Sequence, residues 1–149
     1  MAVFETIAAE AEEESSLWGE CLVPGQERDQ VAVFSPLAAD RFALGLETIY
    51  EAYLVHFGKP RLFDPPDRDT ALLLGDYLYA HGLVRIAETG DVAAVAALSE
   101  LISTCARLRA EGLPGDGQAW VETTRILDGA RVDAEATERA LAAHSLRLS

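Results

Sequence analysis

The sequence has 149 residues, half of them hydrophobic, and carries 12 Lys and Arg against 25 Asp and Glu, a formal net charge of −13. This length and apolar content allow one domain with a single core that needs neither disulfides nor a structural metal. The acidic balance argues against nucleic acid and anionic membrane as partners, because both attract positively charged surfaces.

The cysteines and the apolar runs indicate the cellular setting. Cys21 and Cys105 lie far apart and show no zinc-ligand or redox spacing, which favours a reduced, cytoplasmic protein. The apolar runs are interrupted by charges before the ~18 to 20 residues of a membrane span, and the N-terminus is acidic where a signal peptide would be basic. We therefore expect a soluble protein without an integral membrane segment.

Abundant alanine, with glycine and proline gathered at a few places, predicts an all-α fold, a bundle of about five or six helices in a single domain over 1–149. Residues 1–35 are predicted to form an N-terminal helix and a loop that ends at Ser35-Pro36, typical of an N-cap and a first helical proline. Three long core helices are predicted within 36–111, and two short C-terminal helices within 112–149.

The first long helix, predicted to run from Pro36 to Phe57, carries its acidic residues on one side. At about 100° per residue, Asp40, Glu47 and Glu51 form an acidic strip opposite the apolar side, so we expect this strip to face water. Leucine and valine side chains flank the strip, and the helix is therefore more apolar than one buried face requires. This surplus predicts a second contact surface. Its candidate interface residues, with two from the next long helix, are Leu44, Leu54, Val55, Leu74 and Leu78.

The second long helix, predicted over about 69–89 with Asp67 or Asp69 as its N-cap, is apolar nearly all round. Its polar stripe consists of His81, Arg85 and Glu88. Asp76 falls outside that stripe, among leucines and alanines, so we expect its carboxylate to be buried and paired. The open interpretations are a ligand-facing carboxylate, an ion pair with Arg61, Lys59 or His56, and a hydrogen-bonded packing residue. A third long helix, capped by Asp91, is predicted over about 92–110.

Few side chains indicate chemistry. Asp64, Asp67 and Asp69 are spaced closely enough for a divalent cation, but turn and cap chemistry explains them without a metal and is the interpretation we favour. His56 lies on an apolar face, where a core histidine is the plainer interpretation, and His81 and His144 are predicted to be exposed. The sequence offers no catalytic or metal-binding motif. The candidate ligand-binding or tunnel-lining residues are His56, Asp76, Tyr53, Tyr77 and Tyr79.

One pattern resembles a known family. Leu54-Val55-His56, a proline-containing turn, Ala71-Leu-Leu-Leu-Gly75-Asp76-Tyr77-Leu78-Tyr79 and a helix reopened by Gly90-Asp91 are similar to the trans-polyprenyl diphosphate synthases. The helices of that family read Leu-Ile-His-Asp-Asp-x-x-Asp and, after a loop, Ala-x-Leu-x-Gly-Asp-Tyr-Leu. The Gly-Asp-Tyr element also resembles the small component, component I, of the two-subunit heptaprenyl and hexaprenyl diphosphate synthases. The resemblance covers roughly residues 37–110.

The departures from the family pattern define what the resemblance implies. Phe57-Gly58 stand where the family has two magnesium-binding aspartates, and 111–149 hold no second such motif. The resemblance thus implies part of the isoprenoid synthase fold in a non-catalytic, regulatory small subunit. Such a subunit would bind a catalytic prenyl diphosphate synthase subunit, contact the growing isoprenoid chain and help to set its length. It would bind no cofactor itself, with Mg²⁺ only on the catalytic partner.

Two other functions are compatible with the residues. The first is a stand-alone homodimeric helical domain that binds an apolar small molecule, for which self-association would take the place of the catalytic partner. The second is an enzyme that uses Asp76 and His56 as an acid/base pair.

Overall fold

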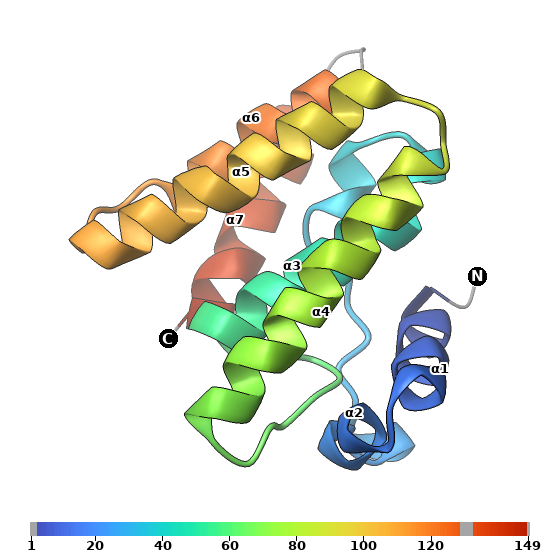
Figure 1. The fold of residues 1–149 in the computed structure, drawn as a ribbon. Helices are drawn as coiled ribbons and strands as arrows, with labels where there is room; N and C mark the ends of the chain where they lie inside the picture. Colours follow the sequence, from blue (N-terminus) through green and yellow to red (C-terminus); the bar gives the residue numbers. More distant parts are fainter. Residues whose placement is uncertain (1–2, 129–132, 149) are drawn as a thin grey trace.

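The computed structural model describes residues 3–128 and 133–148, and within them the chain is all-α, as predicted (Figure 1). Residues 25–27, 35–37 and 40–42 form short 3-10 turns, and a single antiparallel bridge pairs Leu22 with Phe63. No described helix is long and apolar enough to cross a membrane. The helices are α1 (Val3–Glu14), α2 (Ser16–Cys21), α3 (Ala43–Phe57), α4 (Arg68–Ala87), α5 (Val92–Glu111), α6 (Asp116–Asp128) and α7 (Ala134–Leu148).

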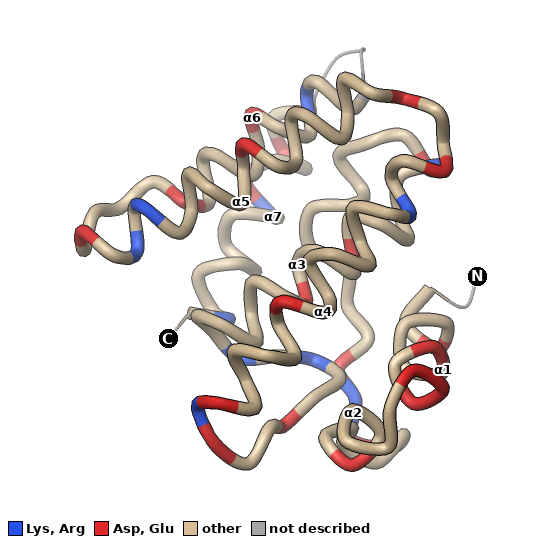
Figure 2. Tube along the Cα trace, viewed as in Figure 1, with Lys and Arg blue, Asp and Glu red and all other residues tan. Residues whose placement is uncertain are grey.

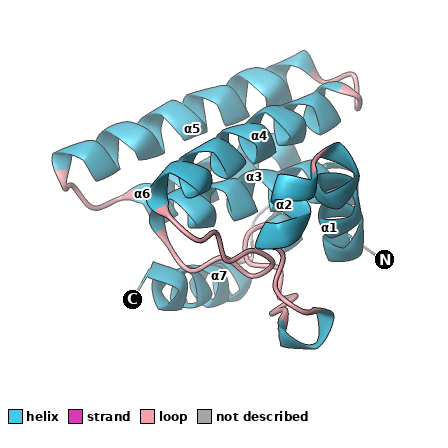
Figure 3. Cartoon of the chain, turned by 60° about the horizontal axis from the view of Figure 1, so that its bottom comes forward, coloured by secondary structure: helices cyan, strands magenta, loops and turns pink. Residues whose placement is uncertain are grey.

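Helix α3 occupies the centre, and every residue from Gly45 to Val55 is buried. It contacts α4, α1 and α7, while α5 contacts α4 and α6. Figure 3 shows α3, α4 and α5 side by side, with α1 and α2 together on one side of the molecule and α7 on another. Two apolar clusters result, one toward α5, α6 and α7 and the other toward α1 and α2.

Glycines allow α3 and α4 to approach closely. A Cβ atom on Gly82 would lie 3.2 Å from the backbone nitrogen of Ile49 and 3.3 Å from the carbonyl oxygen of Gly45. Because these are backbone atoms, no side-chain rotation would relieve the contact. The two helices therefore pack at a separation that a larger residue at Gly82 would increase.

Local signals set most helix ends as the sequence predicts. Asp67 accepts a hydrogen bond from the Thr70 backbone N–H at 2.8 Å, so it caps α4 in preference to Asp69. Asp91 accepts one from Ala94 at 3.0 Å and caps α5, which ends at Gly112 in the left-handed conformation. Asp133 accepts a hydrogen bond from the Glu135 N–H at 3.0 Å at the start of α7.

The first long helix is shorter than predicted, because α3 begins at Ala43 and not at Pro36. Ala38 and Ala39 adopt extended conformations between two 3-10 turns, which interrupts the helix. Phe34, and not Ser35, stands at the cap position of the first turn and makes no capping bond. Burial of Phe34 and Leu37 in the core accounts for this path. A further difference is α2, capped by Ser15 within the segment expected to be a loop.

Candidate functional site

Two residues of the predicted acidic strip, Glu47 and Glu51, are buried, contrary to the prediction, whereas Asp40 precedes α3 and is exposed. Glu47 and Glu51 are only 2 % and 0 % exposed. The reason is Arg61, fully buried between them, whose Nη1 lies 2.6 Å from Glu47 Oε1 and whose Nε lies 3.0 Å from Glu51 Oε1. The sequence leaves open an ion pair between Arg61 and Asp76. In the structure, Arg61 pairs instead with Glu47 and Glu51 of α3.

This buried cluster binds backbone groups as well as pairing charges. The second oxygen of Glu51 accepts the backbone N–H groups of Arg61 at 2.9 Å and Leu62 at 2.8 Å. Arg61 also donates to the Val31 carbonyl oxygen at 2.9 Å. Burial alone would lower the pKa of Arg61, but the attraction of Glu51 and Glu47 outweighs it and raises that pKa. Arg61 therefore stays charged, and the cluster holds the turn after α3 and the segment at Val31 in place.

A second buried network lies between α3, α6 and α7. The Tyr50 hydroxyl is 2.8 Å from His144 Nδ1, and His144 Nε2 is 3.7 Å from Asp116 Oδ1. Tyr53 donates to the other oxygen of Asp116, which also lies 3.7 Å from Arg109 Nε. The prediction that His144 is exposed is wrong, because α7 turns this side chain toward α3 and Phe34.

Protonation in this network follows from its hydrogen bonds. The polar interaction with the nearby His144 ring is the main reason that the pKa of Asp116 is lowered, so its carboxylate is ionised at neutral pH. Burial raises the pKa of Tyr50, which keeps its hydroxyl protonated. An ionised carboxylate therefore anchors two tyrosines and a histidine inside the core.

An open cavity of about 550 Å³ lies where α3, α4 and α5 meet, and we call it the α3–α5 pocket. His56 Nε2 lies on its wall, 3.1 Å from the Leu72 carbonyl oxygen. Arg109 of α5 lines the pocket and donates to the Phe57 carbonyl oxygen at 3.0 Å, and Arg68 of α4 lines it as well. The lining residues are His56, Phe57, Arg68, Leu72, Ala106, Arg109 and Ala110.

Asp76 lies at the surface beside this pocket, and the prediction that it is buried is wrong. Its side chain is 72 % exposed, although Oδ1 lies 3.6 Å from His56 Nε2, so one of the predicted pairings does occur. Helix α4 packs on α3 through Leu74 and Leu78, which turns Asp76 outward. Asp76 does have apolar neighbours on α4, as predicted, but these neighbours are exposed to solvent as well.

The three candidate tyrosines do not converge on one tunnel. Tyr53 lies in the core beside Asp116, and Tyr79 contacts His56 with ring centroids 5.3 Å apart. Tyr77 faces α2 instead, stacked on Trp18 at 5.9 Å and on His81 at 5.4 Å. The structure therefore brings together His56, Asp76 and Tyr79 and places Tyr77 elsewhere.

The predicted interface residues lie mainly inside the chain. Leu54, Val55, Leu74 and Leu78 are buried and Leu44 is partly buried, because α1 and α4 cover α3. The surplus apolar surface is on the outer side of α4, where Leu72 and Leu73 are exposed near one end and Val84 near the other. Figure 2 shows long uncharged stretches along this side of the molecule. We call Leu72, Leu73, Ala80 and Val84, with exposed Asp76 among them, the α4 outer face.

The polar stripe of α4 is partly covered by α1. Glu10 accepts a hydrogen bond from His81 Nε2 at 2.8 Å and pairs with Arg85. The hydrogen bond from His81 is the main cause that lowers the pKa of Glu10. His81 is therefore half-buried and paired, whereas the sequence predicts an exposed side chain.

The acidic turn before α4 acts as a cap. Among the described residues, no three His, Cys, Asp or Glu side chains are arranged to hold a metal ion. The hydrogen bond from Thr70 lowers the pKa of Asp67, as expected for an N-cap carboxylate. Capping therefore accounts for Asp67.

Comparison with known proteins gives no match for this chain among protein-family models, curated proteins or solved structures. The functional argument therefore rests on the pockets, the networks and the surface described above.

Proposed function

We propose that the chain is a non-catalytic, regulatory helical subunit that binds a catalytic polyprenyl diphosphate synthase through the α4 outer face and helps to set product chain length. The observation that carries the proposal is the exposure of Leu73 and Val84, at 58 % and 52 %, on one helix side. Apolar side chains gathered on one face are typical of a surface that is covered in an assembly. The Gly75-Asp76-Tyr77 element, which carries the resemblance, lies on this same helix.

The interface expected here differs from the one that the sequence indicates. Glycines bring the inner side of α4 against α3, so only its outer side is free for a partner. Covering exposed leucine and valine contributes roughly 25 cal/mol per Å² of apolar surface removed from water. A charge introduced into that contact would be desolvated without a partner and would weaken the assembly.

The test is to mix the purified chain with a catalytic trans-polyprenyl diphosphate synthase of the same genome. Light scattering would report the complex, and assays with allylic diphosphate, isopentenyl diphosphate and Mg²⁺ would report the product chain length. We expect a complex with an altered chain length, and no product from the isolated chain. A lack of association, or prenyl transfer by the isolated chain, would contradict the proposal.

A matched pair of variants locates the contact. Leu73→Glu on the α4 outer face should weaken the complex at least tenfold, equivalent to about 1.4 kcal/mol. Ile126→Glu on α6, at a side chain 62 % exposed, should leave it unchanged. Equal effects of the two substitutions would place the interface elsewhere.

A second candidate function is a stand-alone homodimeric domain that binds a small molecule with an apolar body. The α3–α5 pocket favours it, because its volume lies in the range of small-molecule sites and Leu72 and Phe57 form part of its wall. Arg68 and Arg109 would add preference for an anionic group on that molecule. Purification as a homodimer that retains a ligand, read out by native mass spectrometry, would favour this function over the first.

A further inference from the structure

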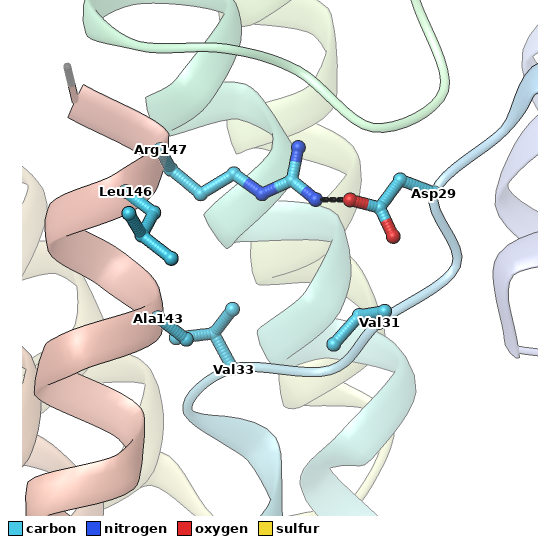
Figure 4. A pocket seen from close by; sticks show the side chains of 6 residues that line it. All are labelled: Asp29, Val31, Val33, Ala143, Leu146 and Arg147. Atoms are coloured by element: carbon cyan, nitrogen blue, oxygen red, sulfur yellow. Dashed lines mark ion pairs between the residues drawn. The ribbon is translucent and has the colours of Figure 1, made fainter.

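Two arginines from different helices meet in the α3–α5 pocket. Arg68 is the first residue of α4 and Arg109 lies in the last turn of α5, and no described Asp or Glu lines this cavity. The cavity beside α7 is different, because its lining cation, Arg147, pairs across it with Asp29 (Figure 4). In a chain with a formal net charge of −13, the α3–α5 pocket therefore offers an anion two cations in one place.

The protein itself uses only part of the hydrogen-bonding capacity of these arginines. Arg68 is exposed and makes no ion pair within the described residues, and the neighbouring Asp67 is engaged as the N-cap of α4. Arg109 donates one hydrogen bond, to the Phe57 carbonyl oxygen. Its Nε is buried without a hydrogen-bond partner in the described part of the chain, 3.7 Å from Asp116 Oδ2. Because each guanidinium group carries five N–H donors, both retain donors for a ligand.

The charges around the pocket favour a ligand with a single negative charge. Asp116 already offsets part of the charge of Arg109, and Asp76 lies 3.6 Å from His56 Nε2 at the pocket wall. A diphosphate, with several negative charges, would exceed what the two arginines can balance and would be repelled by these aspartates. A carboxylate has one charge and two acceptor oxygens, which match the donor fork of a guanidinium group.

The rest of the wall is largely apolar and is already formed. Leu72 and Phe57 contribute to it, together with two alanines of α5. The His56 ring packs edge-on against Phe57 and Tyr79, with centroid distances of 5.7 Å and 5.3 Å. It also lies over Gly75, where a Cβ atom would clash with the ring. A pocket whose wall is fixed in advance loses less conformational entropy when a ligand binds.

We propose that the α3–α5 pocket binds an apolar monocarboxylate, such as a medium-chain fatty acid. Arg68 and Arg109 would hold the carboxylate, and the hydrocarbon chain would lie along Leu72 and Phe57. This inference rests on the second candidate function, which requires only a molecule with an apolar body. It adds the identity of the charged group and limits that group to one negative charge.

The test is isothermal titration calorimetry of the full chain at neutral pH with decanoate, 1-decanol and decyl diphosphate. The three probes share one hydrocarbon chain and differ only in the head group. Decanoate should bind at least tenfold more tightly than either of the other two.

A matched set of variants locates the bound carboxylate. Arg68→Gln should weaken decanoate binding at least tenfold and leave decanol binding unchanged. Ala106→Trp, which fills the pocket, should weaken the binding of both probes. Arg107→Gln, at an exposed arginine that pairs with Glu111 outside the pocket, should bind decanoate as the wild type does.

Four results would overturn the proposal. Three are absence of decanoate binding, decyl diphosphate binding as tight as that of decanoate, and equal decanoate binding by the wild type and Arg68→Gln. The fourth, equal binding of decanoate and decanol, would leave the second candidate function intact, whereas no binding of any probe would contradict both. Because Arg68 is exposed, its substitution is not expected to unfold the chain, so this comparison stays valid even if Ala106→Trp fails to fold.

Discussion

Helices α3 and α4 lie against each other, yet their charged residues have opposite environments. Glu47 and Glu51 of α3 are in the core, whereas Asp76 of α4 is at the surface. The difference is the presence of a cation: Arg61 reaches both glutamates, while the one ion-pair partner of Asp76 among the described residues is His56, at 3.6 Å. The environment of an acid thus depends on what pairs with it more than on the polarity of its own helix.

Removal of the Arg61 cation should have the largest effect on stability. Arg61→Met leaves Glu47 and Glu51 buried without a counter-charge, so we expect a loss of about 3 to 5 kcal/mol in the free energy of unfolding. Urea denaturation at neutral pH measures it. Arg107→Met, at an exposed arginine of α5, serves as the control and should change stability by less than about 0.5 kcal/mol. Similar midpoints for both variants would contradict a buried ion cluster.

The close packing of the two helices gives the next prediction. Gly82→Ala places a methyl group against the backbone of Ile49 and Gly45, so we expect a net loss of about 1 to 3 kcal/mol despite the better helix propensity of alanine. Thermal and urea denaturation measure it. Gly25→Ala, where a Cβ would meet no atom within 4 Å, should change stability far less. A stabilised Gly82→Ala variant would show that the helices are further apart.

The network around Asp116 should make stability depend on pH. The pKa of this carboxyl group is lowered in the folded chain, chiefly by the nearby His144 ring, so the unfolded state binds more protons in acid. Its stabilising contribution should be complete above the ordinary aspartate pKa of about 3.8 and disappear as the pH falls through the lowered value. Urea denaturation between pH 6 and pH 3 should therefore show wild type and Asp116→Asn converging in acid. Parallel curves would contradict this coupling.

Asp76 should give the smallest effect. Because its side chain is 72 % exposed, Asp76→Ala should change the free energy of unfolding by less than about 0.5 kcal/mol, in contrast to the larger loss expected for a buried acid. Asp67→Ala, which removes the N-cap of the same helix, should cost about 1 kcal/mol. A loss of 2 kcal/mol or more in Asp76→Ala would place this carboxylate inside the protein.

The sequence predicts the features that depend on neighbouring residues. Asp67, Asp91 and Gly112 set helix ends through hydrogen bonds and backbone conformation within a few positions, and the all-α class follows from the same signals. The buried side of α3 depends instead on Arg61, which lies beyond the helix in the turn that follows it. Helical periodicity assigns Glu47 to water because it contains no information on that cation.

In the candidate site, too, the sequence predicts some contacts and gives no local signal for others. The proximity of His56 and Asp76 is among the pairings that the sequence leaves open, and it is present. The Tyr50–His144 contact joins residues 94 positions apart and has no local signal, so His144 was expected at the surface. The sequence likewise places interface residues on α4 but on its buried side, at Leu74 and Leu78, because periodicity does not tell which side of an apolar helix meets α3.

The two backbone bonds accepted by Glu51 have a consequence for hydrogen exchange. Arg61 and Leu62 belong to an irregular turn, where amide protons ordinarily exchange rapidly with solvent. Here both amides donate to a carboxylate that is 0 % exposed. Their protons can exchange only when α3 and the turn separate. In deuterated water, these two amides should therefore exchange as slowly as those in the middle of α3.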